Sequence, residues 1–116
     1  MIGELFRRMF GRVKVEGPQE RGQRLLKANL TPEQRQQYER DLCFDVIGGS
    51  TCCRYRIRHG TILNIDILNQ RGDRTGRLCF APHGDLVCAD VMLAQKIALE
   101  TFEADALSVA VPGTNR

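Results

Sequence analysis

Large aromatic side chains are scarce in this sequence. Its 116 residues include no Trp, only two Tyr and five Phe. Proteins that bind single-stranded nucleic acid by base stacking use exposed aromatic side chains for this purpose. The composition therefore argues against a large stacking platform.

Long apolar runs are also lacking. The sequence contains no stretch of 18 consecutive apolar residues, which is about the length that a membrane-spanning helix requires. The segment Met1 to Phe10 is interrupted by Glu4, Arg7 and Arg8, so it lacks the apolar region of a secretory signal. We therefore expect a cytoplasmic protein.

Metal-binding and catalytic patterns are missing as well. The only histidines are His59 and His83, and the five cysteines form no C-x2-C pair. An odd number of cysteines without a signal indicates free thiols in a reducing compartment. Zinc requires four N or S ligands in a tetrahedron, and Cys52 and Cys53 would point to opposite faces of a strand. We predict no metal, no cofactor, no catalytic residues and no enzymatic activity.

The positive charge is concentrated near the N-terminus. The net charge is +3, with seven Lys or Arg against three Glu in residues 1–30 and ten against eleven acidic residues in 31–116. In residues 1–14, apolar residues recur at helical spacing among Arg7, Arg8, Arg12 and Lys14. This pattern predicts a basic amphipathic helix, which would dock on the protein's own core, an anionic membrane surface or a partner.

Domain boundaries follow from the same pattern. Residues 1–29 are predicted to be this N-terminal arm and a linker, with the linker at 15–22 and a helical turn or two at 23–29. Residues 30–110 should form a single domain, and residues 111–116 a frayed tail.

A capping box gives the clearest local signal. Thr31 suits the N-cap, Pro32 the first helical position and Gln34 the third. The helix should run to about Asp41, with Tyr38 and Leu42 as its main apolar anchors, and its thin apolar stripe suggests a position on the surface.

Four strands are predicted next, and they occupy residues 43–47, 52–58, 61–68 and 74–81. Gly48-Gly49 lacks the lysine of a phosphate-binding loop and precedes a strand, so it reads as a hairpin turn. Alternation places Tyr55 and Ile57 on one face and the arginines of the second strand on the other. A three-residue loop at 59–61 would pair Ile57 with Leu63 and set Arg54 opposite Asp66, with Asn64 on the outer face.

A broad apolar pattern over residues 90–110 predicts a buried C-terminal helix with Asp90 as its N-cap. The fold class is therefore α+β: a four-stranded antiparallel β-meander, a C-terminal helix packed on one face and an N-terminal helical arm.

The arginine row is the most definite surface feature. Three guanidinium groups on one strand face are suited to gripping phosphates or carboxylates, although Asp45 and Asp66 should neutralise part of that face. The predicted binding residues are Arg54, Arg56, Arg58, His59 and Arg77 in the sheet, with Arg7, Arg8 and Arg12 in the arm.

Three stretches of the sequence are similar to those of a known group of proteins, namely residues 44–49, residues 55–60 with Asn64, and residues 90–96. On these stretches the chain, over about residues 30–110, resembles a small domain of unknown function found in bacteria and phages. The resemblance implies the α+β fold and says almost nothing about function. Members of that group more often carry Gly-Arg where this chain has Cys52-Cys53, which implies that these thiols are particular to this protein.

Three functions remain open. The first is a non-enzymatic interaction module that binds another macromolecule, most readily a protein, through the open sheet face and the basic N-terminal arm. The second is a nucleic-acid-binding protein that uses the arginine row and the arm. The third is a thiol or zinc-binding protein.

Overall fold

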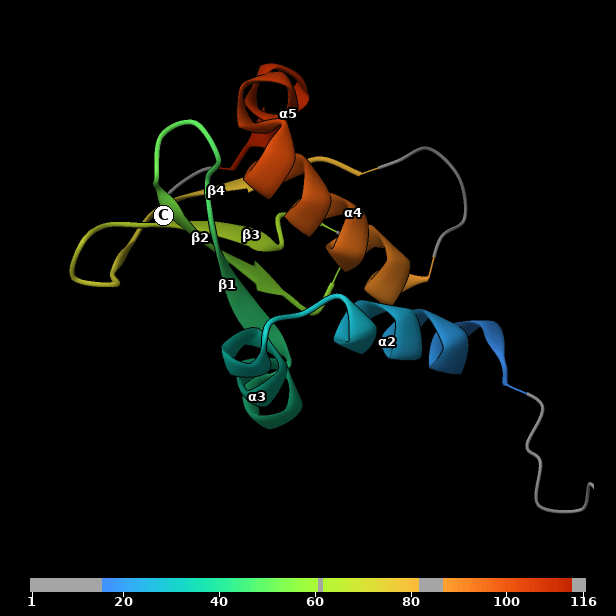
Figure 1. Cartoon of the computed structure of the whole chain (residues 1–116). Helices are drawn as coiled ribbons and strands as arrows, with labels where there is room; N and C mark the ends of the chain where they lie inside the picture. The colour runs from blue at the N-terminus through green and yellow to red at the C-terminus, as the bar shows by residue number, and fades with distance from the viewer. Residues whose placement is uncertain (1–15, 61, 82–86, 114–116) are drawn as a thin grey trace, which may run out of the picture.

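The computed structural model describes residues 16–60, 62–81 and 87–113. They form an α+β fold whose antiparallel sheet has the order β1-β2-β3-β4-β5 (Figure 1). The predicted α+β meander is confirmed, although the sheet has five strands where four were expected. The strands are β1 (Cys43–Ile47), β2 (Arg54–Arg58), β3 (Ile65–Leu68), β4 (Arg74–Cys79) and β5 (Val111–Pro112).

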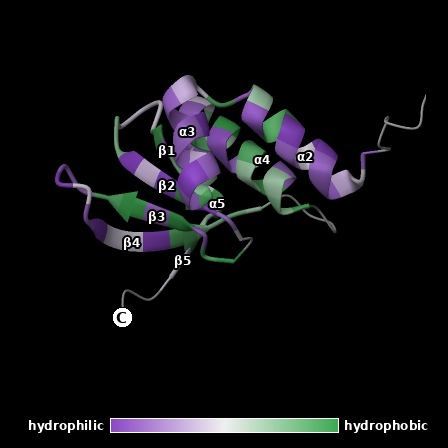
Figure 2. Cartoon of the chain, turned by 90° about the horizontal axis from the view of Figure 1, so that it is seen from below, coloured by the Kyte–Doolittle hydropathy of each residue, from purple (hydrophilic) through white to green (hydrophobic). Residues whose placement is uncertain are grey.

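Helices lie on one side of the sheet and along one of its edges. Helix α4 packs on β1 and β2, α2 runs beside α4, and α3 lies against β1 (Figures 1 and 2). The predicted packing of a C-terminal helix on one sheet face is therefore confirmed. The helices of the described residues are α2 (Pro18–Ala28), α3 (Pro32–Asp41), α4 (Cys88–Thr101) and α5 (Glu103–Val109).

The apolar core lies between the sheet and these helices. The face of the sheet toward α4, here called the inner face, contributes buried Phe44, Val46, Tyr55, Ile57 and Ile65. The opposite face, here called the outer face, carries the alternate residues of the same strands. Its members are Asp45, Ile47, Arg54, Arg56, Arg58, Asp66, Leu68 and Arg77.

The capping box forms as predicted. Gln34 N–H donates to Thr31 Oγ1 at 3.2 Å, and Thr31 N–H donates to Gln34 Oε1 at 3.0 Å. Tyr38 is buried and packs edge-on against Phe44. Leu42 is not the predicted anchor, because it ends the helix in the left-handed conformation (φ 57°) with its side chain exposed.

Residues 18–28 form helix α2 rather than the expected linker and isolated turn. Pro18 does not interrupt the chain's helical structure. It occupies the first position of α2, where its missing N–H costs no hydrogen bond. Leu26 is fully buried. Gly22 lets α2 approach α4 closely, since a Cβ there would lie 3.0 Å from Asp90 Oδ1.

The β2–β3 register differs from the predicted one by two residues. Ile57 pairs with Ile65 and Arg56 with Asp66, so the faces of these strand residues are as predicted but their partners are not. The predicted outward position of Asn64 is wrong, and its inward turn accounts for the shifted register. Asn64 pairs with Gln95 through two amide hydrogen bonds of 2.7 and 3.0 Å and is 1% exposed.

The predicted C-terminal helix is divided. It begins at Cys88 with Val87 as N-cap, so Asp90 lies within the first turn. Phe102 leaves the helical conformation (φ −133°, ψ 45°) and separates α4 from α5. This break turns Glu103 into the interior and leaves Phe102 exposed, contrary to the predicted stripe.

The predicted frayed tail contains strand β5, whose Val111 pairs with Cys79 of β4. The N-terminal helix predicted for residues 1–14 lies outside the described residues. Within those residues, no helix combines the length and the apolar content that a membrane crossing requires.

Candidate functional site: the outer face of the sheet

A row of alternating charges crosses the outer face from β1 to β4. The register sets Asp45 opposite Arg56, Arg56 opposite Asp66 and Asp66 opposite Arg77. Opposite charges on directly paired residues of a sheet stabilise the pairing. The row therefore fixes strand register as well as surface charge.

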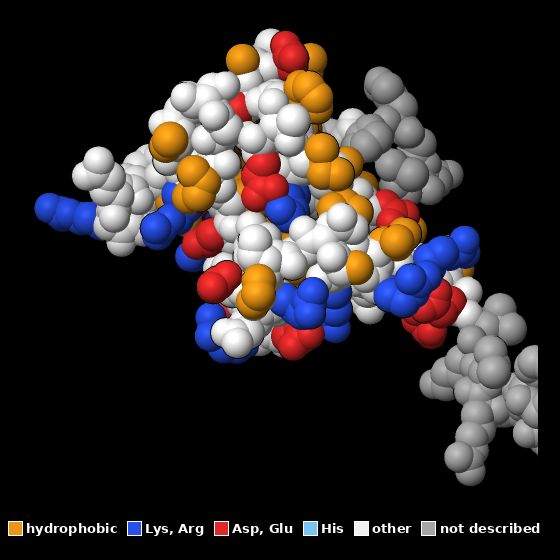
Figure 3. Space-filling model, viewed as in Figure 1, with side chains coloured by type: hydrophobic (Ala, Val, Ile, Leu, Met, Phe, Trp, Pro, Cys, Tyr) orange, Lys and Arg blue, Asp and Glu red, His pale blue; other side chains and the backbone are white. Residues whose placement is uncertain are grey.

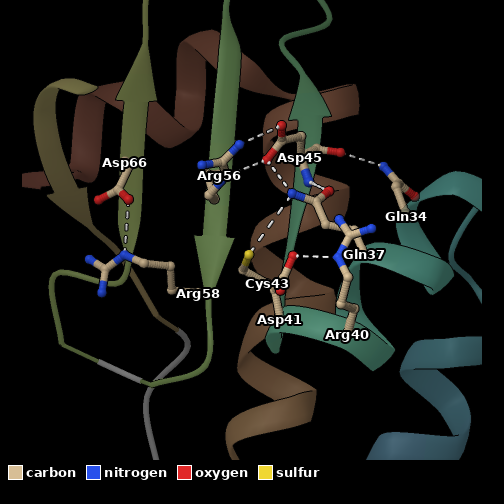
Figure 4. A network of polar contacts seen from close by, with 9 residues as sticks. All are labelled: Gln34, Gln37, Arg40, Asp41, Cys43, Asp45, Arg56, Arg58 and Asp66. Carbon is tan, nitrogen blue, oxygen red and sulfur yellow. Dashed lines mark hydrogen bonds and ion pairs between the residues drawn. The ribbon is translucent and has the colours of Figure 1, made fainter. Parts of the chain in front are cut away.

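Arg56 and Asp45 form a two-pronged ion pair (Figure 4). Arg56 Nε donates to Asp45 Oδ1 at 2.8 Å and Nη2 donates to Oδ2 at 3.2 Å. This hydrogen bonding raises the pKa of Arg56 against the opposing effect of burial. A guanidinium held in this way is poorly placed to bind an external anion.

Asp66 lies between two other arginines. Arg58 Nε donates to Asp66 Oδ2 at 3.0 Å, and Arg58 Nη2 donates to the carbonyl oxygen of Leu63 at 2.7 Å. Arg77 Nε lies 3.7 Å from Asp66 Oδ1. Three of the four predicted arginines are therefore paired on their own face.

Arg54 differs from its neighbours. Its side chain is exposed and makes no ion pair within the part of the chain that the structure describes. It stands in register between Ile47 of β1 and Leu68 of β3, and Leu68 is followed across the sheet by exposed Arg74. Figure 3 shows blue Lys or Arg side chains at the end of the molecule formed by the β3–β4 turn.

A hollow of about 500 Å³ opens beside Arg54. Ile47 and Leu68 give it an apolar floor, and the two neighbouring turns form its walls. This hollow, here called the Arg54 hollow, is lined by Ile47, Thr51, Cys52, Cys53, Arg54, Leu68, Asn69 and Gln70. The lining is mixed, because Ile47 and Leu68 are aliphatic and most of the other side chains are polar or charged.

One wall of the hollow is fixed by buried Glu103. Its Oε1 accepts from the N–H groups of Ser50 and Thr51 at 2.9 and 2.8 Å, and its Oε2 accepts from the hydroxyls of Thr51 and Tyr55, both at 2.6 Å. Burial alone would raise the pKa of Glu103, but the hydrogen bonds from Thr51, Tyr55 and Ser50 outweigh it and lower that pKa to about 2. The β1–β2 turn is thus tied to the start of α5.

The turn also needs its two glycines. A Cβ on Gly48 would collide with the Glu103 carboxylate, and one on Gly49 with the backbone carbonyl oxygen of Glu100. Gly49 N–H donates to the Leu99 carbonyl at 3.0 Å. The predicted hairpin turn is present, but its anchorage to Glu103 was not foreseen, because a lone Glu in an amphipathic pattern reads as surface.

Helix α3 completes the other side of the face by covering the free edge of β1. Gln37 Oε1 accepts from Asp45 N–H at 2.9 Å, and Gln34 Nε2 donates to the Asp45 carbonyl at 2.9 Å (Figure 4). Two glutamine amides therefore replace the neighbouring strand that an edge lacks, which protects it from strand-to-strand association.

The structure does not group all the predicted residues. His59 lies away from the arginines, with its Nδ1 3.5 Å from Cys88 Sγ. Arg7, Arg8 and Arg12 lie outside the described residues. None of the five cysteines forms a disulfide, and within the described ranges no three potential ligands from His, Cys, Asp and Glu lie close enough to hold a metal ion.

A second opening lies at the far edge of the sheet. This groove of about 740 Å³ is mainly apolar, and Ile62, Phe80, Val109 and Val111 are among its lining residues. We call it the β5 groove. It carries no charged side chain in its lining, in contrast to the Arg54 hollow.

Comparisons of the chain with protein-family models, with curated proteins and with solved structures found no match. The functional argument therefore depends on the geometry and charge of the surface itself.

Proposed function

We propose that this protein is a non-enzymatic interaction module that binds an acidic segment of another protein on the outer face of its sheet. The observation that carries the proposal is Arg54, an exposed guanidinium without an ion pair in the described residues, at a hollow with an apolar floor. A planar guanidinium binds carboxylates through two parallel hydrogen bonds.

Charge complementarity selects the kind of partner. Five arginines (54, 56, 58, 74 and 77) face two aspartates on or beside the outer face. An excess of fixed positive charge attracts acidic surfaces and raises their association rate. The apolar floor adds the desolvated contact that interfaces place at their centre.

A protein partner fits this face better than a nucleic acid. Binding along a phosphate backbone uses several available cations in succession, whereas Arg56 and Arg58 are each hydrogen-bonded to an aspartate and Arg77 lies 3.7 Å from one. Positive and negative side chains alternate on the outer face. A protein surface, which also mixes charged and apolar groups, matches this pattern better than a uniformly negative phosphate backbone does. The basic segment with Arg7, Arg8 and Arg12 would supply a second electrostatic contact.

The test is a titration of the full chain with a synthetic peptide of alternating Glu and Leu, followed by fluorescence anisotropy. Arg54→Ala should weaken binding about fivefold, which corresponds to about 1 kcal/mol for a partly exposed ion pair. The matched control is Arg21→Ala, because Arg21 is an exposed arginine on α2, on the other side of the sheet. It should leave the affinity unchanged.

Three results would count against the proposal. Equal weakening by Arg21→Ala would mean that only net charge matters. No binding of the peptide at low salt would remove the proposal altogether. Binding of a mixed-sequence oligonucleotide in place of the peptide, with an affinity that falls steeply as salt increases, would support the nucleic-acid alternative.

A further inference from the structure

Cys88 and His59 form a pair on the other side of the sheet from the Arg54 hollow. Cys88 Sγ lies 3.5 Å from His59 Nδ1. The N–H of Gly60 donates to the same sulfur at 3.0 Å, and the Cys88 thiol donates to the Gly60 carbonyl oxygen at 3.4 Å. A thiol beside an imidazole has next to it the kind of base that nucleophilic cysteine chemistry requires.

The fold sets the position of each group. Cys88 is the first residue of α4, a helix of 14 residues. His59 is held at the end of β2 by its N–H, which donates to the Leu42 carbonyl at 2.9 Å. Both reacting groups are therefore placed by regular elements.

A cavity of about 130 Å³ opens beside the pair. Its walls come from α2 and from the start of α4, and two glutamine amides make its far side polar. The lining residues are Gln19, Gln23, His59, Val87, Cys88 and Ala89. A small polar molecule that enters this cavity meets the sulfur directly.

We propose that Cys88 is a nucleophilic thiol, with His59 as its base, that exchanges with small disulfides entering the cavity. His59 Nδ1 takes the thiol proton, and the Cys88 thiolate attacks one sulfur of a disulfide R–S–S–R. A bond forms between Cys88 Sγ and that sulfur while the S–S bond of the disulfide breaks. The leaving thiolate RS⁻ then takes the proton from His59, so the products are Cys88–S–S–R and RSH.

This site is independent of the proposed interaction on the outer face. The disulfide is the oxidant and is reduced by two electrons as it yields one thiol and one mixed disulfide. Gln19 and Gln23 in the lining favour disulfides with polar groups, and bis(2-hydroxyethyl) disulfide is a probe small enough for this cavity. The product would place a bulky group between α2 and the start of α4.

The experiment treats the reduced full chain with limiting bis(2-hydroxyethyl) disulfide at neutral pH and maps the modified cysteines by peptide mass spectrometry over time. Exposed Cys52 serves as the internal control in the same molecule. Because His59 can take the thiol proton as the sulfur attacks, Cys88 should react at least about tenfold faster than Cys52. His59→Gln should remove this advantage at Cys88 without changing the rate at Cys52.

A second measurement at alkaline pH distinguishes two effects of His59→Gln, namely the loss of the base and a structural change around Cys88. Above the ordinary thiol pKa of about 8.5 every accessible thiol ionises without help, so His59→Gln should then match the unmodified protein at Cys88. A Cys88 rate no higher than that of Cys52 would overturn the proposal. A His59→Gln rate that is unchanged at neutral pH, or still low at alkaline pH, would overturn the role of His59.

Discussion

Replacing Glu103 with Gln tests how strongly the β1–β2 turn is tied to the rest of the domain. The substitution keeps the shape of the side chain but removes the negative charge that accepts four hydrogen bonds. A buried carboxylate with this many donors is one of the few single positions whose loss strongly destabilises a small protein.

The magnitude follows from the pKa of Glu103, which falls from its ordinary 4.5 to about 2. At roughly 1.4 kcal/mol per pH unit, this difference corresponds to roughly 3 kcal/mol of folding free energy at neutral pH. Four charge-assisted hydrogen bonds would give more, but burying the carboxylate offsets part of that gain. We therefore expect Glu103→Gln to lower the free energy of unfolding by roughly 3 kcal/mol.

The assay is urea unfolding of both proteins at pH values from 7 down to 2. Because the folded-state pKa is depressed, the stabilisation is fully present above 4.5 and is lost as the pH falls through about 2. The difference between the two proteins should therefore be constant from pH 7 to about 4.5 and shrink below that. The control is Asp105→Asn, which changes an exposed carboxylate in the same helix and should have an effect of about 0.5 kcal/mol or less.

Two results would refute this reasoning. A difference below about 1 kcal/mol at pH 7 would mean that the carboxylate contributes little net stability, as many buried charges do. A difference that stays constant down to pH 2 would mean that the effect comes from packing and not from the charge. A urea slope changed by the substitution would show that the denatured state had changed as well.

Two further substitutions probe the close contacts of the fold. Gly49→Ala places a Cβ against the backbone of Glu100 and should lower the free energy of unfolding by about 2 kcal/mol or more. The control is Gly17→Ala, which has open space around it and should cost less than about 1 kcal/mol. Thermal unfolding of both variants measures the difference. Asn64→Ala removes the hydrogen bond to the buried Gln95 Oε1, although Gln95 Nε2 still donates to the Phe80 carbonyl, and should cost about 2–3 kcal/mol. Asn64→Leu combined with Gln95→Leu should cost less than the sum of the two single changes, and additive costs in this double-mutant cycle would contradict the pairing.

Local patterns predicted the elements of this fold well. The capping box at Thr31 and the alternation around Tyr55 each depend on short-range geometry, and both are confirmed. The faces of the strands were therefore known before their partners were. Register failed because it depends on Asn64, whose partner Gln95 lies 31 residues away and gives no local signal.

Polar residues in apolar surroundings caused the other errors. Gln95 and Glu103 are buried at positions where a hydropathy pattern expects surface, because each has a hydrogen-bond partner far away in the sequence. Gln95 donates to the Phe80 carbonyl, and Glu103 accepts from the Tyr55 hydroxyl. Their burial also shifts the buried stripe of α4 away from Ile97, which is half exposed. Pro18 was taken as a break because the same residue type starts helices and interrupts them.

The candidate site was predictable only as a set of arginines. Alternation placed Arg54, Arg56 and Arg58 on one face. Which of them forms an ion pair depends on the strand register, so the sequence could not show which arginine remains available for a partner. The pairing of Cys88 with His59 joins residues 29 positions apart and has no counterpart in the sequence pattern. The Arg54 hollow and the Cys88–His59 pair are both formed by contacts between residues far apart in the sequence, so neither could be predicted from local patterns.

The most direct test of the proposed interaction is a chemical-shift titration of the isotope-labelled protein with the alternating Glu and Leu peptide. The proposal predicts that the largest changes occur at the backbone amides of Arg54, Leu68 and Asn69, around the Arg54 hollow, and that Arg54→Ala reduces them. Changes confined to the β5 groove at Ile62 and Val111, or no changes at low salt, would contradict it.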